Sequence, residues 1–275
     1  MSDISIVKGI KTMTKKEIYE SNGITLVNGK INSPYGLINP VLVNGNSKLG
    51  NGVYTFSTLP TNKEYTITVN DMDFVVRGTC PCHCVGCYAT KGNYNFKSVK
   101  TSLGVKTLLA THYVNFLKRA IIAQITADNI KIIRVHASGD FHSDEYINMW
   151  REIAEMFPNV VMWTYTKNAQ AEHAFDDLNN FNVVKSVIPG KGFNFGHIDY
   201  ILSLYEYLTN IGKSVYVCRC GIDKNQHCNA CKACSTFDYV LFIEHSTEYK
   251  AEKDSLYPVI VNLIESQDKS VLVAD

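Results

Sequence analysis

All nine cysteines of the chain fall into two short clusters, and these are the residues with the most direct chemical meaning. The first cluster lies within residues 80–88, and the second contains Cys218, Cys220, Cys228, Cys231 and Cys234. Thiols a few residues apart direct several sulfur ligands at one point, as a soft metal or an iron–sulfur cluster requires. An odd number of cysteines also disfavours a complete set of disulfides. The clusters therefore predict two metal sites.

Composition places few other limits on function. The chain has 275 residues and is 45% hydrophobic, enough for one large domain or two small ones with a sizeable core. Its formal net charge of +1 gives no general attraction to nucleic acid or membrane. No leader-like N-terminus and no run of about 18 apolar residues is present, so we expect a cytoplasmic protein without a membrane partner.

The elements that must position the cysteines differ along the chain. Residues 1–70 are rich in Gly, Asn and Thr, with short strand-like runs at 24–27 and 53–56 and Asn-Gly turn signals. We expect a small β-rich N-terminal region there.

From residue 71 onward, predicted strands and helices alternate. The expected strands are 74–76, 132–135, 160–165, 183–188, 214–217 and 239–243. The expected helices are 102–127, a helix capped by Ser143 and ended by Pro158, 168–178 and 197–210. Such alternation is typical of an α/β fold with parallel strands, whose carboxyl ends gather the loops on one face. Strand 74–76 would deliver the chain to Cys80, and strand 239–243 would be the last of the sheet.

Cys80, Cys84 and Cys87 have the spacing Cys-x3-Cys-x2-Cys. This pattern resembles the signature of the radical S-adenosylmethionine superfamily, in a loop after the first strand of a partial (β/α)6 TIM-like barrel. The resemblance implies that three thiolates hold a [4Fe–4S] cluster whose fourth iron binds S-adenosylmethionine. It also implies an electron donor such as flavodoxin or ferredoxin, and cleavage of the cofactor to a 5′-deoxyadenosyl radical.

Cys82 and His83 leave open a second interpretation of the first cluster, as a zinc site. Cys82 would be a spare thiol, a candidate catalytic thiol directed at the substrate, or the fourth ligand of a zinc site. His83 could also ligate zinc.

Ser138, Gly139 and Asp140 follow the predicted strand 132–135. They match in position and charge a Gly-Gly-Glu-like motif that holds the amino group of the cofactor in the superfamily. The shorter Asp side chain would need a closer backbone, which Gly139 permits.

Other cofactor contacts are expected nearby. The superfamily usually has an aromatic residue before the third cysteine, against adenine; here Gly86 stands there and Tyr88 follows. Thr164, Lys167 and Ser186, at the next two strands, are candidates for the carboxylate and ribose of the cofactor.

A closer resemblance rests on several runs together. They are Ser47-Lys-Leu-Gly-Asn-Gly-Val-Tyr-Thr-Phe56, Cys87-Tyr88, Ser138-Gly-Asp-Phe-His-Ser-Asp-Glu-Tyr146, Tyr165-Thr-Lys167 and the late Cys-x2-Cys-x2-Cys. Over residues 46–240 these resemble the phage gene-product-88 family, which implies a viral or prophage origin, hence a host cytoplasm, and no defined reaction.

The second cluster offers four thiolates from its five cysteines. It resembles the auxiliary-cluster extension of radical enzymes, and structural zinc is the alternative. We therefore divide the chain into a β-rich region (1–70), a partial barrel (71–217) and a Cys-rich cap with the last strand and tail (218–275).

The substrate stays open at this stage. Between Lys91 and Lys131 there are seven Lys or Arg residues and one acid, with Tyr94 and Phe96 interleaved. A solvated helix face explains this stretch, and nucleic acid is the functional alternative. We predict a radical S-adenosylmethionine-type enzyme; the alternative is a non-catalytic phage accessory protein with two structural zinc sites.

Overall fold

A computed structural model describes residues 13–45, 49–81, 87–186, 195–219, 222, 227–243 and 254–271. Its helices are α1 (Lys15–Ser21), α2 (Lys97–His112), α3 (Val114–Ala127), α4 (Asp144–Met156), α5 (Ile198–Asn210), α6 (Cys228–Cys231) and α7 (Tyr257–Val271). Short 3-10 turns are η1 (Tyr88–Thr90), η2 (Gly92–Asn95) and η4 (Ala233–Ser235). Cys82, Cys84, Gly86 and Cys220 lie outside the described residues, as do His83 and residues 187–188 of a predicted strand.

The strands of the described residues form four sheets. They are β1 (Leu26–Val27), β2 (Lys30–Ser33), β3 (Gly36–Ile38), β4 (Val43–Asn44), β5 (Val53–Phe56), β6 (Glu64–Val69), β7 (Met72–Arg77), β8 (Ile132–Val135), β9 (Val161–Thr166), β10 (Phe181–Lys185), β11 (Phe195–Gly196), β12 (Val215–Val217) and β13 (Tyr239–Ile243). The central sheet has the order β10-β9-β8-β5-β4, in which all neighbours are parallel except β4 and β5. The four parallel strands therefore follow one another in chain order.

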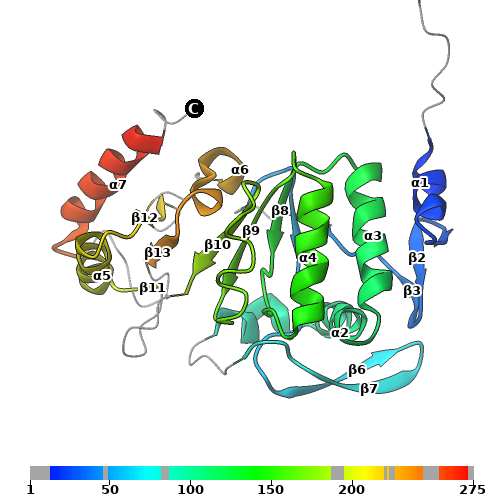
Figure 1. Cartoon of the computed structure of the whole chain (residues 1–275). Helices are drawn as coiled ribbons and strands as arrows, with labels where there is room; N and C mark the ends of the chain where they lie inside the picture. Colours follow the sequence, from blue (N-terminus) through cyan, green and yellow to red (C-terminus); the bar gives the residue numbers. More distant parts are fainter. Residues whose placement is uncertain are drawn as a thin grey trace, which may run out of the picture.

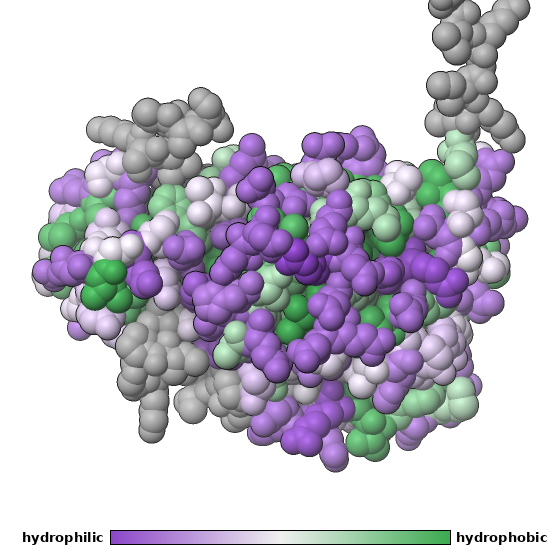
Figure 2. Space-filling model, viewed as in Figure 1, coloured by the Kyte–Doolittle hydropathy of each residue, from purple (hydrophilic) through white to green (hydrophobic). Residues whose placement is uncertain are grey.

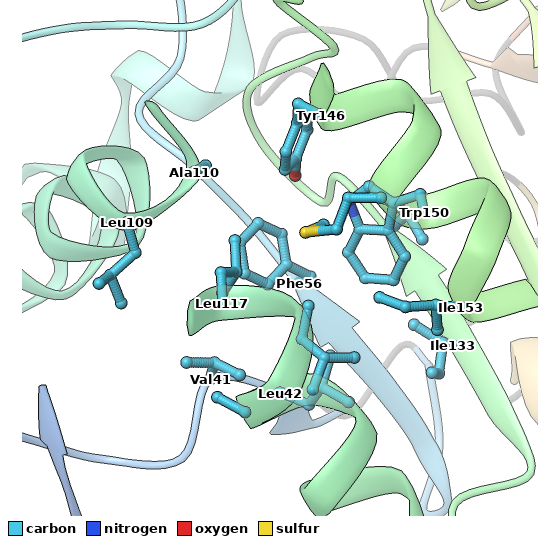
Figure 3. Packing of buried hydrophobic residues seen from close by; sticks show 14 of the residues in the cluster. Val41, Leu42, Phe56, Leu109, Ala110, Leu117, Ile133, Tyr146, Trp150 and Ile153 are labelled. Atoms are coloured by element: carbon cyan, nitrogen blue, oxygen red, sulfur yellow. The ribbon is translucent and has the colours of Figure 1, made fainter. Parts of the chain in front are cut away.

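One face of the central sheet packs against helices α2, α3 and α4 (Figure 1). Side chains alternate along a strand, so Ile133 and Val135 of β8 face these helices while Arg134 faces the other way. Figure 3 shows Phe56 of β5 lying among Leu117 of α3 and Tyr146 and Trp150 of α4. We call the opposite side, which carries Arg134, the inner face.

Helix α4 confirms its predicted start. The Ser143 side chain accepts a hydrogen bond from the backbone N–H of Tyr146, and Asp144 and Glu145 occupy the first turn. Its apolar side joins the core, and the side turned to solvent is largely hydrophilic in Figure 2.

The first parallel strand is not the predicted one. Strand β7 does lead to Cys80, but it pairs antiparallel with β6 in a separate hairpin. The parallel sheet instead begins with β5, which we expected in the β-rich N-terminal region. A strand's own residues do not reveal its partner, and here the hairpin β6–β7 is inserted between β5 and the helices that follow.

Two predicted helices differ. The single helix at 102–127 is broken at Tyr113, which has φ −138° and packs edge-on against Tyr35 with ring centroids 5.6 Å apart. The predicted helix at 168–178 is a series of turns. There Gln170 N–H donates to the Asn168 side chain, and Arg151 donates to the carbonyl of Ala174, so local polar contacts replace the helical ladder.

A second sheet follows, with the order β11-β13-β12 and parallel neighbours. The N–H of Lys185 donates to the carbonyl of Asp238 at 2.8 Å, which joins β10 to the start of β13. Strand β13, the expected last strand of the barrel, lies between β11 and β12 rather than at an edge. Neither sheet pairs its two ends within the described residues, and the partial barrel stays a prediction.

The hydrophobic cores do not follow the predicted division at residue 70. One core includes residues from Tyr19 to Val183, so parts of the N-terminal region and the parallel sheet share it. A second core includes residues from Ile198 to Ile264. Among the described helices, none is both long and apolar enough to cross a membrane.

Candidate functional site

The first cysteine cluster begins beside the end of β5. The N–H of Thr79 donates to the carbonyl of Leu59 at 3.0 Å, and the N–H of Cys80 donates to the carbonyl of Thr61 at 3.0 Å. The hydroxyls of Thr58 and Thr79 are 2.7 Å apart. After the hairpin β6–β7 the chain therefore comes back to the carboxyl end of β5, the first parallel strand, and Cys80 lies there.

The Ser138-Gly139-Asp140 turn is attached to the same place. The Ser138 hydroxyl donates to the carbonyl of Thr58 at 2.7 Å, and the N–H of Thr58 donates back to the carbonyl of Ser138 at 3.1 Å. The N–H of Asp140 donates to the Thr79 hydroxyl at 3.0 Å. The end of β8 thus holds both the end of β5 and the residue before Cys80.

The far end of the cysteine loop reaches this turn as well. The Tyr88 hydroxyl donates to the carbonyl of Ala137, which also accepts from Tyr94 at 3.4 Å. The two tyrosine rings meet edge-on, with centroids 5.9 Å apart. Cys87 precedes Tyr88, so both ends of the loop that contains the first cluster lie at the carboxyl ends of β5 and β8.

Asp140 has partners within the protein. Its carboxylate accepts hydrogen bonds from the Thr166 hydroxyl at 2.6 Å, the N–H of Lys167 at 2.8 Å and the N–H of Phe141 at 2.8 Å. Burial raises the pKa of Asp140 to about 6, and these hydrogen bonds act in the opposite direction. The carboxylate therefore ties the end of β9 to the turn; its expected contact with a cofactor amino group stays a prediction.

Gly139 is required at its position for two reasons. Its φ of +80° lies in the left-handed region, and a Cβ there would collide with the hydroxyl oxygen of Thr58.

We predict that Gly139→Ala lowers the free energy of unfolding by about 3 kcal/mol or more, because backbone strain and a clash add together. Gly212→Ala is the matched control, since Gly212 has φ +74° but no heavy atom within 4 Å of the place that a Cβ would occupy. That variant should lose only about 1–2 kcal/mol. Urea unfolding of both variants measures the difference, and equal losses would contradict a clash at the turn.

His136 is a residue of this site that sequence reasoning missed. It is 3% exposed and has a positive φ of 62°, which is uncommon for a residue with a side chain. Its Nε2 lies 2.9 Å from the hydroxyl of Tyr146, on α4. Burial lowers the pKa of His136 to about 3, and the charge of neighbouring His142 acts in the same direction. His136 thus anchors the turn to α4 as a neutral imidazole.

Of the other predicted cofactor residues, Thr164 lies within β9, whereas Lys167 and Ser186 directly follow β9 and β10. Thr164 is fully buried and pairs in register with Val135 and Val183, on the face covered by helices. A cofactor on the inner face would not reach it. The backbone N–H of Lys167 donates to the Asp140 carboxylate. Ser186 is half-buried, and its N–H donates to the carbonyl of Thr166 at 3.2 Å.

The second cluster packs onto the inner face. Asn182 of β10 donates its side-chain amide to the carbonyl of Cys234 at 2.9 Å, and Asn229 N–H donates to the carbonyl of Leu49 at 3.1 Å. Cys228 and Cys234 pack beside Trp163, and Figure 1 shows α6 near β9 and β10. This placement brings the second cluster to the sheet that holds the first.

The thiols of the second cluster have polar neighbours. The Tyr165 hydroxyl donates to Cys234 Sγ at 2.7 Å, and Cys231 Sγ donates to the Tyr216 hydroxyl at 3.8 Å. Cys218 is buried in a hydrophobic cluster against which Cys231 and Cys234 pack. Among the residues that the structure places, no three His, Cys, Asp or Glu side chains form a group able to hold a metal. Both metal sites stay predictions, and Cys82, Cys84 and Cys220 lie outside that part of the chain.

Comparisons with known proteins agree with one of the two resemblances. A curated relative, the Gene 88 protein of Mycobacterium phage D29, is 32% identical over 82 residues, covering 25% of this chain and 34% of that protein. The match thus spans about a third of the relative. No solved structure matches the chain. The family model described as Gene product 88 matches residues 40–192, more than half of the chain. The chain therefore belongs to the gene product 88 family, as its motifs predict.

Proposed function

We propose that this protein is a radical S-adenosylmethionine-type iron–sulfur enzyme. The observation that supports it best is the convergence at the carboxyl ends of β5 and β8. Cys80, the Cys87–Tyr88 pair and the Ser138–Asp140 turn meet there, at the edge of a parallel sheet where α/β folds place ligands.

The donor set of the first cluster fits a [4Fe–4S] cluster with one open iron. Cys80 and Cys87 are half-buried cysteines at the two ends of one loop, and Cys84 lies between them in sequence. Three thiolates leave one coordination position for S-adenosylmethionine. When bound, the cluster and the cofactor supply a one-electron reductive cleavage and a carbon radical.

The described residues would fix the geometry of this site. Asp140, through its bonds to Thr166 and Lys167, holds the ends of β8 and β9 together. Tyr88 and Tyr94 hold the exit of the cysteine loop on the carbonyl of Ala137. These contacts would keep the loop in place while its centre binds metal.

The test is anaerobic reconstitution of the full chain with iron and sulfide, followed by iron and sulfide analysis. The reduced protein is expected to convert S-adenosylmethionine to 5′-deoxyadenosine and methionine without added substrate. A fully loaded, reduced cluster that neither cleaves the cofactor nor changes its spectrum on cofactor addition would contradict the proposal. Zinc without iron at both cysteine clusters would favour the non-catalytic zinc protein instead.

A further inference from the structure

Arg134 is a charged residue on the inner face, and no described residue forms an ion pair with it. Its side chain is half-buried, and its Nε is fully buried with no hydrogen-bond partner. Within the described residues the guanidinium makes no hydrogen bond and no ion pair. Its Cζ lies over the ring of Tyr165, 5.1 Å from the ring centroid.

This contact does not replace the hydrogen bond that the buried Nε lacks. A cation–π contact stabilises by about 0.5–2 kcal/mol, and a buried N–H without a partner costs about 1–3 kcal/mol. Guanidinium also has five N–H donors in a planar fork, which a carboxylate or phosphate satisfies two at a time. An anion is the missing partner.

The neighbours of Arg134 do not provide that anion. Tyr88, Tyr94, Tyr165, Cys228 and Cys234 are described groups within electrostatic range of its charge. In the chain without bound metal, tyrosine hydroxyls and thiols with ordinary pKa values are neutral near pH 7. Asp140 follows the same strand, and its carboxylate already accepts hydrogen bonds from Thr166, Lys167 and Phe141.

The position of Arg134 indicates what such an anion would do. Tyr88 follows Cys87 of the first cysteine cluster, while Cys228 and Cys234 belong to the second. All of them lie within electrostatic range of one guanidinium near the carboxyl end of β8. A group bound to Arg134 would therefore lie between the two clusters.

We propose that Arg134 binds an oxyanion, a carboxylate or phosphate group of the substrate, between the two cysteine clusters. The Tyr165 ring below the guanidinium fixes the plane of the fork. The oxyanion site itself does not depend on iron–sulfur chemistry; its assignment to the substrate rests on the proposed function.

The test uses the reduced, metal-free full chain with inorganic phosphate and acetate as probes, against sodium chloride of equal ionic strength. A ligand that binds only the folded state raises the unfolding temperature in a saturable way. We expect this for at least one probe, and the responding probe identifies the oxyanion as phosphate or carboxylate. Arg134→Gln should weaken binding about tenfold or more, the loss of one charged pair.

Two variants keep the test independent of folding defects. Arg134→Lys retains the charge and should keep part of the response. Lys131→Gln removes one positive charge from an exposed residue nearby and should respond like the wild type. If Arg134→Gln does not fold, the comparison of Arg134→Lys with Lys131→Gln still decides, because only the first should weaken binding.

Other outcomes overturn the proposal. No response beyond that of chloride, or an equal response in Arg134→Gln, removes the oxyanion site. Loss of the response after metal loading would make the metal-bound thiolates the counter-ion. Displacement of the probe by S-adenosylmethionine would assign the site to the cofactor rather than the substrate. Failure of iron loading bears only on the proposed function, since the probes are titrated without metal.

Discussion

Replacing Cys80 or Cys84 with alanine is expected to remove the iron and sulfide of one complete [4Fe–4S] cluster and all cleavage of S-adenosylmethionine. Only residues 80, 84 and 87 have the three-ligand spacing, so a variant that keeps two of these three thiolates should not hold the cluster. Iron and sulfide analysis after anaerobic reconstitution measures the loss.

Two matched variants define its specificity. Cys82→Ala removes a thiol from the same loop and should keep the cluster, because Cys82 falls outside the spacing. Cys231→Ala removes a thiol from the second cluster and should spare the first. Equal metal loss in Cys82→Ala and Cys84→Ala would instead indicate a four-cysteine site, which has no open position for the cofactor and favours structural zinc.

Local signals predicted the elements that depend on local chemistry. The Ser143 cap and the acidic first turn predicted the start of α4, and the apolar run at 239–243 coincides with β13. These succeed because capping and strand propensity involve residues that are neighbours in sequence. The predicted helix at 168–178 failed for a related reason, since the Asn168 side chain competes for the same backbone groups.

Strand pairing could not be predicted in the same way. Strands β5 and β7 are both short and partly apolar, yet only β5 pairs with β8, through a register of Val53 with Ile132. The difference is made by partners far away in the chain. Since the hairpin β6–β7 returns to Leu59 and Thr61, it still delivers Cys80 to the expected edge of the sheet.

The sequence likewise identified some residues of the candidate site and missed others. The Ser138–Asp140 motif was identified by its order after a strand, and it does lie beside the cysteine loop. The importance of Arg134 and His136 was missed, because each depends on what surrounds it. A lone Arg inside an apolar strand is nevertheless a usable signal, since charged residues are almost never buried without a partner.

His136 and Asp140 change the stability of the fold in opposite directions as the pH falls. The pKa of Asp140 is raised from 3.8 to about 6, so its burial favours the protonated form and stability increases as pH falls from about 6 to 3.8. The pKa of His136 is lowered from 6.5 to about 3, so the folded state favours the neutral imidazole. The His136 contribution is fully present above pH 6.5 and is lost as pH falls toward 3. The shift of His136 is the larger, so we expect net loss in acid.

We therefore predict that the wild-type chain loses stability between pH 6.5 and 4, and that His136→Asn loses less over the same range. Asn tolerates a positive φ and cannot titrate, so it removes the protonation while keeping the backbone. One pKa unit corresponds to about 1.4 kcal/mol, so the His136 contribution across its full range is on the order of 5 kcal/mol. Urea unfolding at a series of pH values measures the slopes.

His112→Asn is the control for this experiment, because His112 is exposed at the end of α2. The free energy of unfolding of His112→Asn should depend on pH as that of the wild type does. The carboxylates of the chain are the same in all three proteins, so they do not account for a difference in slope. His136→Asn is itself expected to be less stable at pH 7, since it loses the bond to the Tyr146 hydroxyl. The prediction concerns the slope and not that offset. Parallel slopes for His136→Asn and wild type would show that His136 does not have to be neutral for the Ser138–Asp140 turn to form.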